Sequence, residues 1–126
     1  MRLLILGTGR MAHNHMRGYQ GIDGLEVVGA VDTSPDGLAA FADEWGIAQR
    51  FGTLDAALAW GAFDAVDNIT PDAIHHPTTL KVIAAGKHVF CEKPLATNYA
   101  LAQQMVDAAE AAGVINMVNL TYRNVA

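Results

Sequence analysis

The stretch LLILGTGRMAHNH, residues 3–15, decides the fold of this chain. Four apolar residues, Leu3 to Leu6, run directly into Gly7-Thr8-Gly9, and a segment follows in which Ala12, Met16 and Tyr19 recur at helical spacing. A strand that ends in a glycine-rich turn and continues as a helix is typical of phosphate-binding turns, although such turns are common by themselves. The interpretation of this turn therefore depends on the rest of the chain.

Short apolar segments alternate with helical segments along all 126 residues. Several of the apolar segments have almost no polar residue, which is typical of strands covered on both faces. Alternating strands and helices predict a single domain over residues 1–126, a doubly wound α/β fold with a parallel sheet in the Rossmann order 3-2-1-4-5-6. The expected strands are Leu3–Leu6, Leu25–Val31, Gln49–Phe51, Ala65–Ile69, His88–Phe90 and Val114–Val118.

Capping residues predict where the helices begin. Ser34 is a cap followed by Pro35 at the first helical position, and Thr53 is placed to cap a helix at 54–60. By the same reasoning, we expect further helices to begin at Pro77 and after Thr97.

The composition excludes several classes of protein. A hydrophobic content of 52% with 17% charged residues argues against disorder, and at a net charge of −5 the Lys and Arg residues are scattered rather than clustered as in a nucleic-acid-binding protein. The single cysteine, Cys91, excludes an internal disulfide, and we expect a buried thiol there. No segment approaches the roughly 18 apolar residues of a membrane span, and the start of the chain lacks a signal-peptide core. We therefore expect a soluble, cytoplasmic protein.

The residues around the glycine turn indicate a dinucleotide site. Gly7 permits the tight turn, Gly9 lets a pyrophosphate approach the backbone, and Ala12 is small enough for close helix–strand packing. Asp32 ends the second expected strand, 20 residues after Ala12, where a carboxylate accepts hydrogen bonds from the adenosine ribose. Since this carboxylate repels a 2′-phosphate and no arginine follows it, NAD is favoured over NADP. A methyltransferase is the rival interpretation, but it usually has a third glycine where this chain has Met11.

Two later segments also end strands at the crevice: ITPDAIHHP (69–77) and GKHVFCEKPLA (86–96). Lys93 follows the fifth expected strand, so its ammonium group is placed to meet a ligand. A structural ion pair between Lys93 and Glu92 is the alternative. Asp67 and Asn68 are unusual in an apolar strand, and either the crevice or a helix is expected to satisfy them. The five histidines show no zinc spacing, so we expect no metal site.

These motifs together resemble the N-terminal domain of the Gfo/Idh/MocA oxidoreductases, the family of glucose–fructose oxidoreductase and inositol dehydrogenase. The resemblance covers essentially the whole chain, and its most specific parts are AGKHVF followed by Glu92-Lys93-Pro94. The matching residues are Gly7 to Ala12, Asp32, Thr70-Pro71-Asp72 with His75, Ala85 to Val89, Glu92-Lys93-Pro94 and Asn119 to Arg123. Asp72 stands where many members have asparagine.

The resemblance implies a role for each matching residue. Gly7, Gly9, Arg10 and Met11 would line the pyrophosphate, and Asp32 would hold the adenosine ribose. Thr70, Pro71 and His75 would border the middle of the cofactor, Glu92 and Lys93 would lie by the nicotinamide ribose, and Asn119 and Arg123 would approach the nicotinamide. Lys93 would also reach the substrate hydroxyl, as the catalytic residue.

The function expected from the resemblance is that of an NAD-binding domain in a dehydrogenase. The whole enzyme would transfer hydride between NAD and a secondary hydroxyl of a sugar, cyclitol or related polyol. Family members are more than twice as long, so we expect residues 1–126 to be an N-terminal fragment that lacks the C-terminal substrate domain and is inactive alone. That missing domain would supply the substrate pocket and the interface of a homo-oligomer. A non-catalytic NAD-binding or regulatory module stays open as the alternative.

Overall fold

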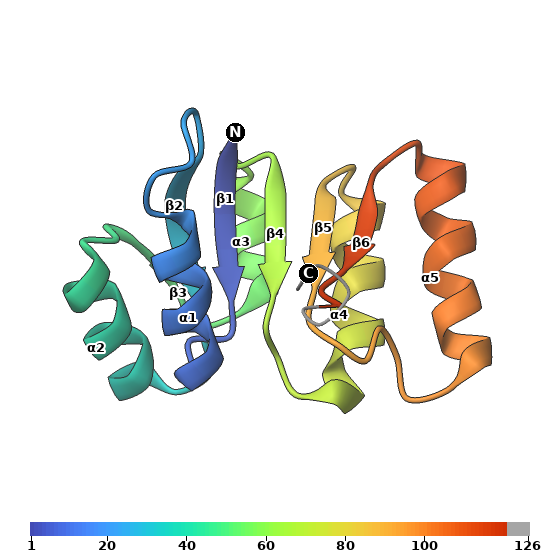
Figure 1. Cartoon of the computed structure of the whole chain (residues 1–126), viewed down its shortest axis with the longest axis horizontal. Coiled ribbons are helices and arrows are strands. Elements are labelled where there is room, and N and C mark those ends of the chain that lie inside the picture. The colour runs from blue at the N-terminus through green and yellow to red at the C-terminus, as the bar shows by residue number, and fades with distance from the viewer. Residues whose placement is uncertain (121–126) are drawn as a thin grey trace, which may run out of the picture.

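A six-stranded parallel sheet forms the centre of the chain in the computed structural model, which describes residues 1–120 (Figure 1). Its order is β3-β2-β1-β4-β5-β6, so the predicted fold class and strand order are confirmed. The strands are β1 (Arg2–Leu6), β2 (Glu26–Val31), β3 (Gln49–Phe51), β4 (Ala65–Asn68), β5 (His88–Cys91) and β6 (Asn116–Val118). The helices are α1 (Arg10–Tyr19), α2 (Pro35–Trp45), α3 (Leu54–Trp60), α4 (Asp72–Ala84) and α5 (Tyr99–Ala112).

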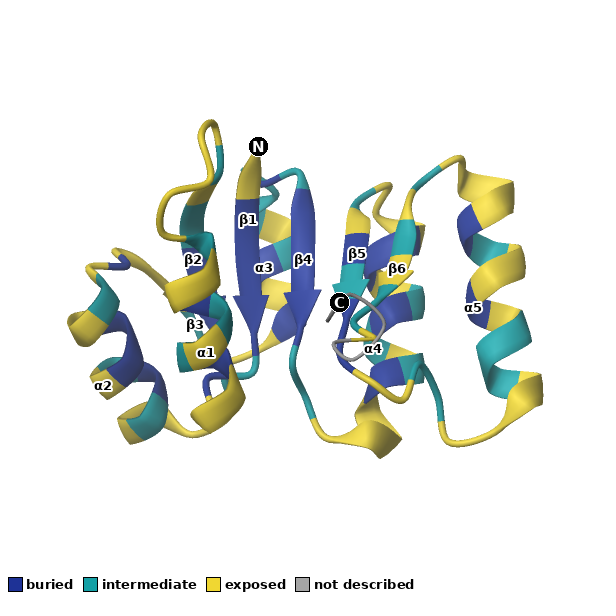
Figure 2. Ribbon diagram, viewed as in Figure 1, coloured by how far each residue is buried: buried dark blue, intermediate teal, exposed yellow. Residues whose placement is uncertain are grey.

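Helices cover both faces of the sheet, with α1 and α2 in front of it and α3 and α4 behind it in the view of Figure 1. A hydrophobic core lies on each face of the sheet, and alternate side chains of the central strand β1 pack into one core or the other. Leu3 and Ile5 pack with α1 and α2, whereas Leu4 and Leu6 pack with α3, α4 and the end of α5. Because water is excluded from both faces, this strand is apolar at successive positions, and Figure 2 shows it buried along nearly its whole length.

Two of the predicted helix caps are confirmed by their hydrogen bonds. The hydroxyl of Ser34 accepts the Gly37 N–H at 3.3 Å, and that of Thr53 accepts the Ala56 N–H at 3.2 Å. Each bond satisfies a backbone donor that has no partner within the first turn of the helix.

The predicted starts of two helices are wrong. Helix α4 begins at Asp72 and contains Pro77 in its interior. The helix tolerates Pro77 by giving up one backbone bond, and the negative charge of Asp72 suits its positive N-terminal end. The cap of α5 is Asn98 rather than Thr97, because the Asn98 side chain accepts the Leu101 N–H at 3.0 Å.

The turn after β1 is held between its two neighbouring strands. The Gly7 N–H donates to Val31 O at 2.9 Å, and the Ile69 N–H donates to Leu6 O at 2.8 Å. Gly7 has a φ of +95°, and a Cβ added to it would lie 2.7 Å from the carbonyl oxygen of Ile69. Both the backbone angle and the contact with Ile69 therefore require glycine at this position.

Gly7→Ala is expected to lower the free energy of unfolding by about 1–3 kcal/mol more than Gly21→Ala, the increment being the cost of overpacking. Gly21 is the matched control, because its φ of +103° imposes a similar backbone strain while nothing lies within 4 Å of an added Cβ. Urea unfolding of both variants measures the difference. Equal losses would show that the contact with Ile69 relaxes without cost.

Candidate functional site

A cavity of about 810 Å³ opens at the carboxyl ends of the central strands. The loops after β1, β2, β3 and β4 form its wall together with one side of α4. This is the crevice at which the strand order reverses, where doubly wound sheets bind ligands. Seven of the residues predicted for cofactor binding line it: Gly7, Gly9, Arg10, Met11, Asp32, Thr70 and Pro71.

The start of α1 faces this cavity with its backbone accessible. Gly9 is the N-cap, no side chain caps the helix there, and the first turn has no acidic residue. A Cβ added to Gly9 would meet nothing within 4 Å. The positive end of the helix dipole is thus open to an anion, while the Ala12 N–H already donates to Gly9 O at 2.9 Å.

Asp32 is held as an anion at the edge of the same cavity. Its Oδ2 accepts the backbone N–H of Thr8 at 2.7 Å and the Thr8 hydroxyl at 2.8 Å, and its Oδ1 accepts the Ser34 N–H at 2.9 Å. Partial burial raises the pKa of this carboxyl, but the hydrogen bonds from Ser34, Thr8 and Thr33 lower it by more, so the net shift is downward. The site therefore presents a fixed, ionised carboxylate.

The loop after β4 is fixed by side chains buried behind the cavity. Asn68 donates to Thr78 Oγ1 at 2.8 Å and Thr79 Oγ1 at 3.1 Å, and its Oδ1 accepts the Thr70 hydroxyl at 2.7 Å. His75 is fully buried, with Nε2 at 2.7 Å from Thr70 O and Nδ1 at 2.7 Å from Pro94 O. His75 thus connects the loop after β4 to the loop after β5, and its direct contact with a cofactor stays a prediction.

The remaining predicted site residues lie outside the lining of this cavity. Glu92, Lys93 and Asn119 follow β5 and β6, beyond β4. Arg123 falls outside the described residues. The roles predicted for these four residues are therefore not tested by the cavity.

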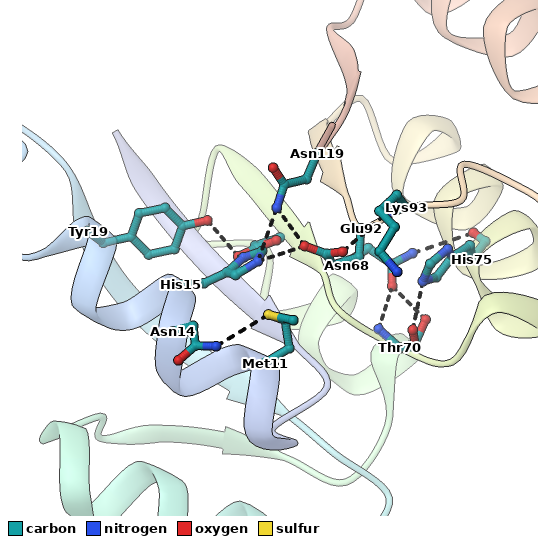
Figure 3. A network of polar contacts seen from close by, with 11 residues as sticks. Met11, Asn14, His15, Tyr19, Asn68, Thr70, His75, Glu92, Lys93 and Asn119 are labelled. Atoms are coloured by element: carbon teal, nitrogen blue, oxygen red, sulfur yellow. Dashed lines mark hydrogen bonds and ion pairs between the residues drawn. The ribbon is translucent and has the colours of Figure 1, made fainter. Parts of the chain in front are cut away.

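Sequence reasoning missed a polar network between α1 and the sheet, shown in Figure 3. His15 Nδ1 lies 2.7 Å from Asp67 Oδ2, and His15 Nε2 lies 2.9 Å from Glu92 Oε1. The Tyr19 hydroxyl donates to Asp67 at 2.6 Å, and the Asn119 amide donates to Glu92 at 2.5 Å. Oδ2 of Asp67 is therefore satisfied by a helix, the second of the two environments expected for this residue.

A signal for this network was present in the sequence. His15 and Tyr19 are four residues apart, so they share one face of α1, and Met16 on that side is buried. An acidic residue in a buried strand needs a partner, and a histidine and a tyrosine on the covering helix are suitable donors. The pairing itself depends on which helix covers which strand.

Two other predictions concern side-chain chemistry. Burial raises the pKa of the Cys91 thiol to about 12, so this cysteine is a buried, unreactive residue as expected. Among residues 1–120, no group of three or more His, Cys, Asp or Glu side chains is arranged to hold a metal ion. Within the same residues, no helix has the length and apolar character to cross a membrane.

Thr8→Val is expected to raise the pKa of Asp32, because it removes the hydroxyl donor to Oδ2 and leaves the backbone donor in place. Carboxyl ¹³C shifts followed through a pH titration measure this change. Ser34→Ala is the control: it removes a helix cap at a cost of about 1 kcal/mol but keeps the backbone N–H to Asp32. If the Asp32 pKa moves in Ser34→Ala and not in Thr8→Val, the Thr8 hydroxyl is not a donor that lowers this pKa.

Comparison with known proteins agrees with this geometry. Residues 1–120 match the family described as "Oxidoreductase family, NAD-binding Rossmann fold". The chain is 38% identical to a 1,5-anhydro-D-fructose reductase of Ensifer adhaerens, over 97% of this chain and 37% of that protein. It is 31% identical to a scyllo-inositol 2-dehydrogenase (NADP(+)) of Bacillus subtilis, over 93% of this chain and 36% of that protein.

A solved structure agrees as well. The WlbA dehydrogenase from Bordetella pertussis, in complex with NADH and UDP-GlcNAcA, superposes with a TM-score of 0.95 at 35% identity, over 100% of this chain and 39% of that one. The chain thus spans well under half the length of these three proteins. The family match, together with the phosphate-type turn and the ionised Asp32, leads to one conclusion: the chain belongs to the Gfo/Idh/MocA oxidoreductases, as an NAD-binding Rossmann domain.

Proposed function

We propose that this chain binds NAD in preference to NADP, and that it serves a dehydrogenase or reductase acting on a sugar, cyclitol or related polyol. The observation that carries the proposal is the cavity in which an open helix N-terminus and a fixed carboxylate lie together. These two features suit the two ends of an adenosine diphosphate group, because one attracts phosphate and the other accepts from ribose hydroxyls.

The pyrophosphate would lie against Gly7, Gly9, Arg10 and Met11. The space in front of Gly9 supports this placement, since a side chain there would occupy the position of the phosphate. Thr70 and Pro71 would border the middle of the cofactor from the opposite wall. The open helix N-terminus, the space at Gly9 and the carboxylate of Asp32 are thus of the right chemistry for this cofactor.

The preference for NAD rests on Asp32. Three donors already hold its two oxygens in place, and its lowered pKa keeps it charged. A 2′-phosphate beside this carboxylate would face an uncompensated negative charge. The Bacillus subtilis relative is named for NADP(+), so the preference varies within the family and must be measured for this chain.

We assign hydride transfer to the part of the site that lies beyond β4, where the segments after β5 and β6 carry the predicted residues. Bound NAD would supply the hydride acceptor. Lys93, as the neutral amine, would hold the substrate hydroxyl and take its proton as the hydride passes to NAD, with Glu92, Asn119 and Arg123 nearer the nicotinamide. The named relatives act on an anhydro sugar and a cyclitol, and this supports the same substrate class here. The rest of the substrate pocket would come from a second domain.

Calorimetric titration of the chain with NAD and NADP tests the cofactor assignment. We expect tighter binding of NAD, and a loss of about tenfold or more in NAD affinity in Asp32→Asn, because a charged acceptor for the ribose is removed. Asp36→Asn is the control, since it removes a nearby charge that does not line the cavity. Equal affinity for the two cofactors would overturn the preference for NAD, and no binding of either would overturn the site.

Lys93→Ala in the whole protein tests the catalytic assignment. With sugars and cyclitols as substrates, we expect kcat to fall by about 10²–10⁴, the usual contribution of a general acid or base, while NAD affinity is retained. Lys93→Arg is the control that keeps the positive charge but cannot give up its proton. Wild-type protein that binds NAD and turns over no substrate of this class would favour the non-catalytic NAD-binding module.

A further inference from the structure

His15 lies between two carboxylates that come from neighbouring strands. Asp67 belongs to β4 and Glu92 follows β5, and each of them approaches a different nitrogen of the His15 ring, at 2.7 Å and 2.9 Å (Figure 3). The exposed fraction of the His15 side chain is 8%, that of Asp67 is 0% and that of Glu92 is 10%. The imidazole is thus the link between the two acids in an environment nearly free of water.

The geometry favours a doubly protonated His15. Ionised carboxylate oxygens only accept hydrogen bonds, so both ring nitrogens must donate for both contacts to form. Burial lowers the pKa of His15, but the hydrogen bonds and charges of Asp67 and Glu92 outweigh burial, and the net shift is upward. The imidazolium therefore neutralises part of the charge that the two acids place inside the fold.

The pKa shifts of the titratable groups around His15 move those groups away from a change of charge at neutral pH. From α1, the Tyr19 hydroxyl has a raised pKa, because of burial and the nearby Asp67. Burial also raises the pKa of Glu92, but the bonds from Asn119, His15 and the Lys93 N–H lower it by more. Phe90, whose ring centroid lies 6.0 Å from that of His15, and Asn119 do not titrate.

Glu92 connects His15 to the backbone at Lys93. Its Oε1 faces His15 and accepts from Asn119, while its Oε2 accepts the backbone N–H of Lys93 at 3.1 Å. One carboxylate oxygen is thus held by α1 and the residues after β6, and the other holds the main chain that carries Lys93. The backbone just beyond Lys93 is held as well, since Pro94 O lies 2.7 Å from His75.

We propose that His15 is a positioning residue: by holding Glu92 against α1, it fixes the backbone of Lys93 and so positions the Lys93 side chain for the substrate. The role given to Lys93 here rests on the proposed function. His15 itself touches no ligand and acts only through Glu92. When His15 loses its second proton, one of the two carboxylates loses a donor and meets a lone pair instead.

The effect has a defined dependence on pH. The folded-state pKa of His15 is raised above its ordinary value of 6.5. The stabilisation that protonated His15 gives to the folded state is therefore fully present below pH 6.5, and it is lost as the pH rises through the raised pKa. The hold on the Lys93 backbone should weaken over the same range. A purely structural side chain would produce no such titration at Lys93.

NMR on the chain tests the proposal through the Lys93 amide. We expect the exchange protection of the Lys93 N–H to fall at least tenfold in His15→Leu and to recover in part in His15→Gln, whose amide retains one donor. Tyr19→Phe is the matched control, because Tyr19 lies on the same helix and contacts Asp67 without contacting Glu92. The amide of Ile5, in β1, reports global stability, so in each variant the loss of protection at Lys93 counts only as far as it exceeds the loss at Ile5.

A second measurement needs no substitution. In the wild-type chain, the Lys93 amide shift should titrate together with the His15 ring nitrogens, with a midpoint above pH 6.5. An unchanged Lys93 amide in His15→Leu, or a Lys93 shift that does not follow His15, overturns the proposal. If His15→Leu does not fold, the wild-type titration decides alone.

These outcomes are separate from those of the cofactor assignment. A chain that fails to bind NAD but shows the coupled titration would refute the proposed function and keep the link between His15 and Lys93. In the whole protein, His15→Gln should lower kcat and change its pH profile while NAD affinity stays the same. A change confined to NAD affinity would contradict a role at Lys93.

Discussion

The candidate site depends on a backbone contact that only glycine allows. Gly7 leaves β1 with a positive φ, and its Cα faces the carbonyl group of Ile69 so closely that no side chain fits between them. The turn is also tied to β2 through Val31. Because the loops after three adjacent strands meet at this point, the start of α1, Asp32 and the loop at Thr70 are fixed relative to one another. A wider turn at Gly7 would separate the part of the site that suits phosphate from the part that suits ribose.

Burial of charge is the second constraint on this fold. Asp67 is completely buried in a central strand, and its Oδ1 has no hydrogen-bond partner within residues 1–120. Leaving an ion in such surroundings costs several kcal/mol unless an opposite charge and good hydrogen bonds offset the cost. His15 and Tyr19 both supply hydrogen bonds to Oδ2, so helix α1 provides the groups that offset the cost of burying Asp67. Removing either donor therefore leaves a buried charge less well compensated, which is more damaging than the loss of a surface ion pair.

Much of the fold could be predicted because its signals are local. The strands are apolar, the caps at Ser34 and Thr53 are short-range hydrogen bonds, and alternation of strands with helices leaves few topologies. The errors are local too. Pro77 resembles a first helical residue, yet α4 begins five residues before it, at Asp72, and Asn98 competes with Thr97 for the same capping role. Adjacent strand residues point to opposite faces, so Asp67 and Asn68 reach different helices, α1 and α4, from neighbouring positions.

The part of the site that escaped prediction is non-local. His15 meets Asp67 across 52 residues and Glu92 across 77 residues, and no spacing rule connects positions that far apart. Their contact follows only from the packing of α1 over β4 and β5. The glycine turn could be recognised because its chemistry is contained in consecutive residues. The support for Lys93 could not, because it is distributed over α1, β4, β5 and the residues after β6.

Helix α1 joins these two parts of the molecule. Gly9 caps its N-terminus at the cavity, and His15 lies six residues further along, a rise of about 9 Å at 1.5 Å per residue. A helix of this length behaves as a rigid element, so its first turn and His15 keep a constant separation. In the proposed complex, an anion bound at the first turn would fix the position of α1, and α1 would in turn hold Glu92 through His15. Helix α1 would thereby keep two distant segments at fixed positions relative to each other: the glycine-rich turn and the segment that carries Lys93. Gly9 and Lys93 are 84 residues apart in the sequence.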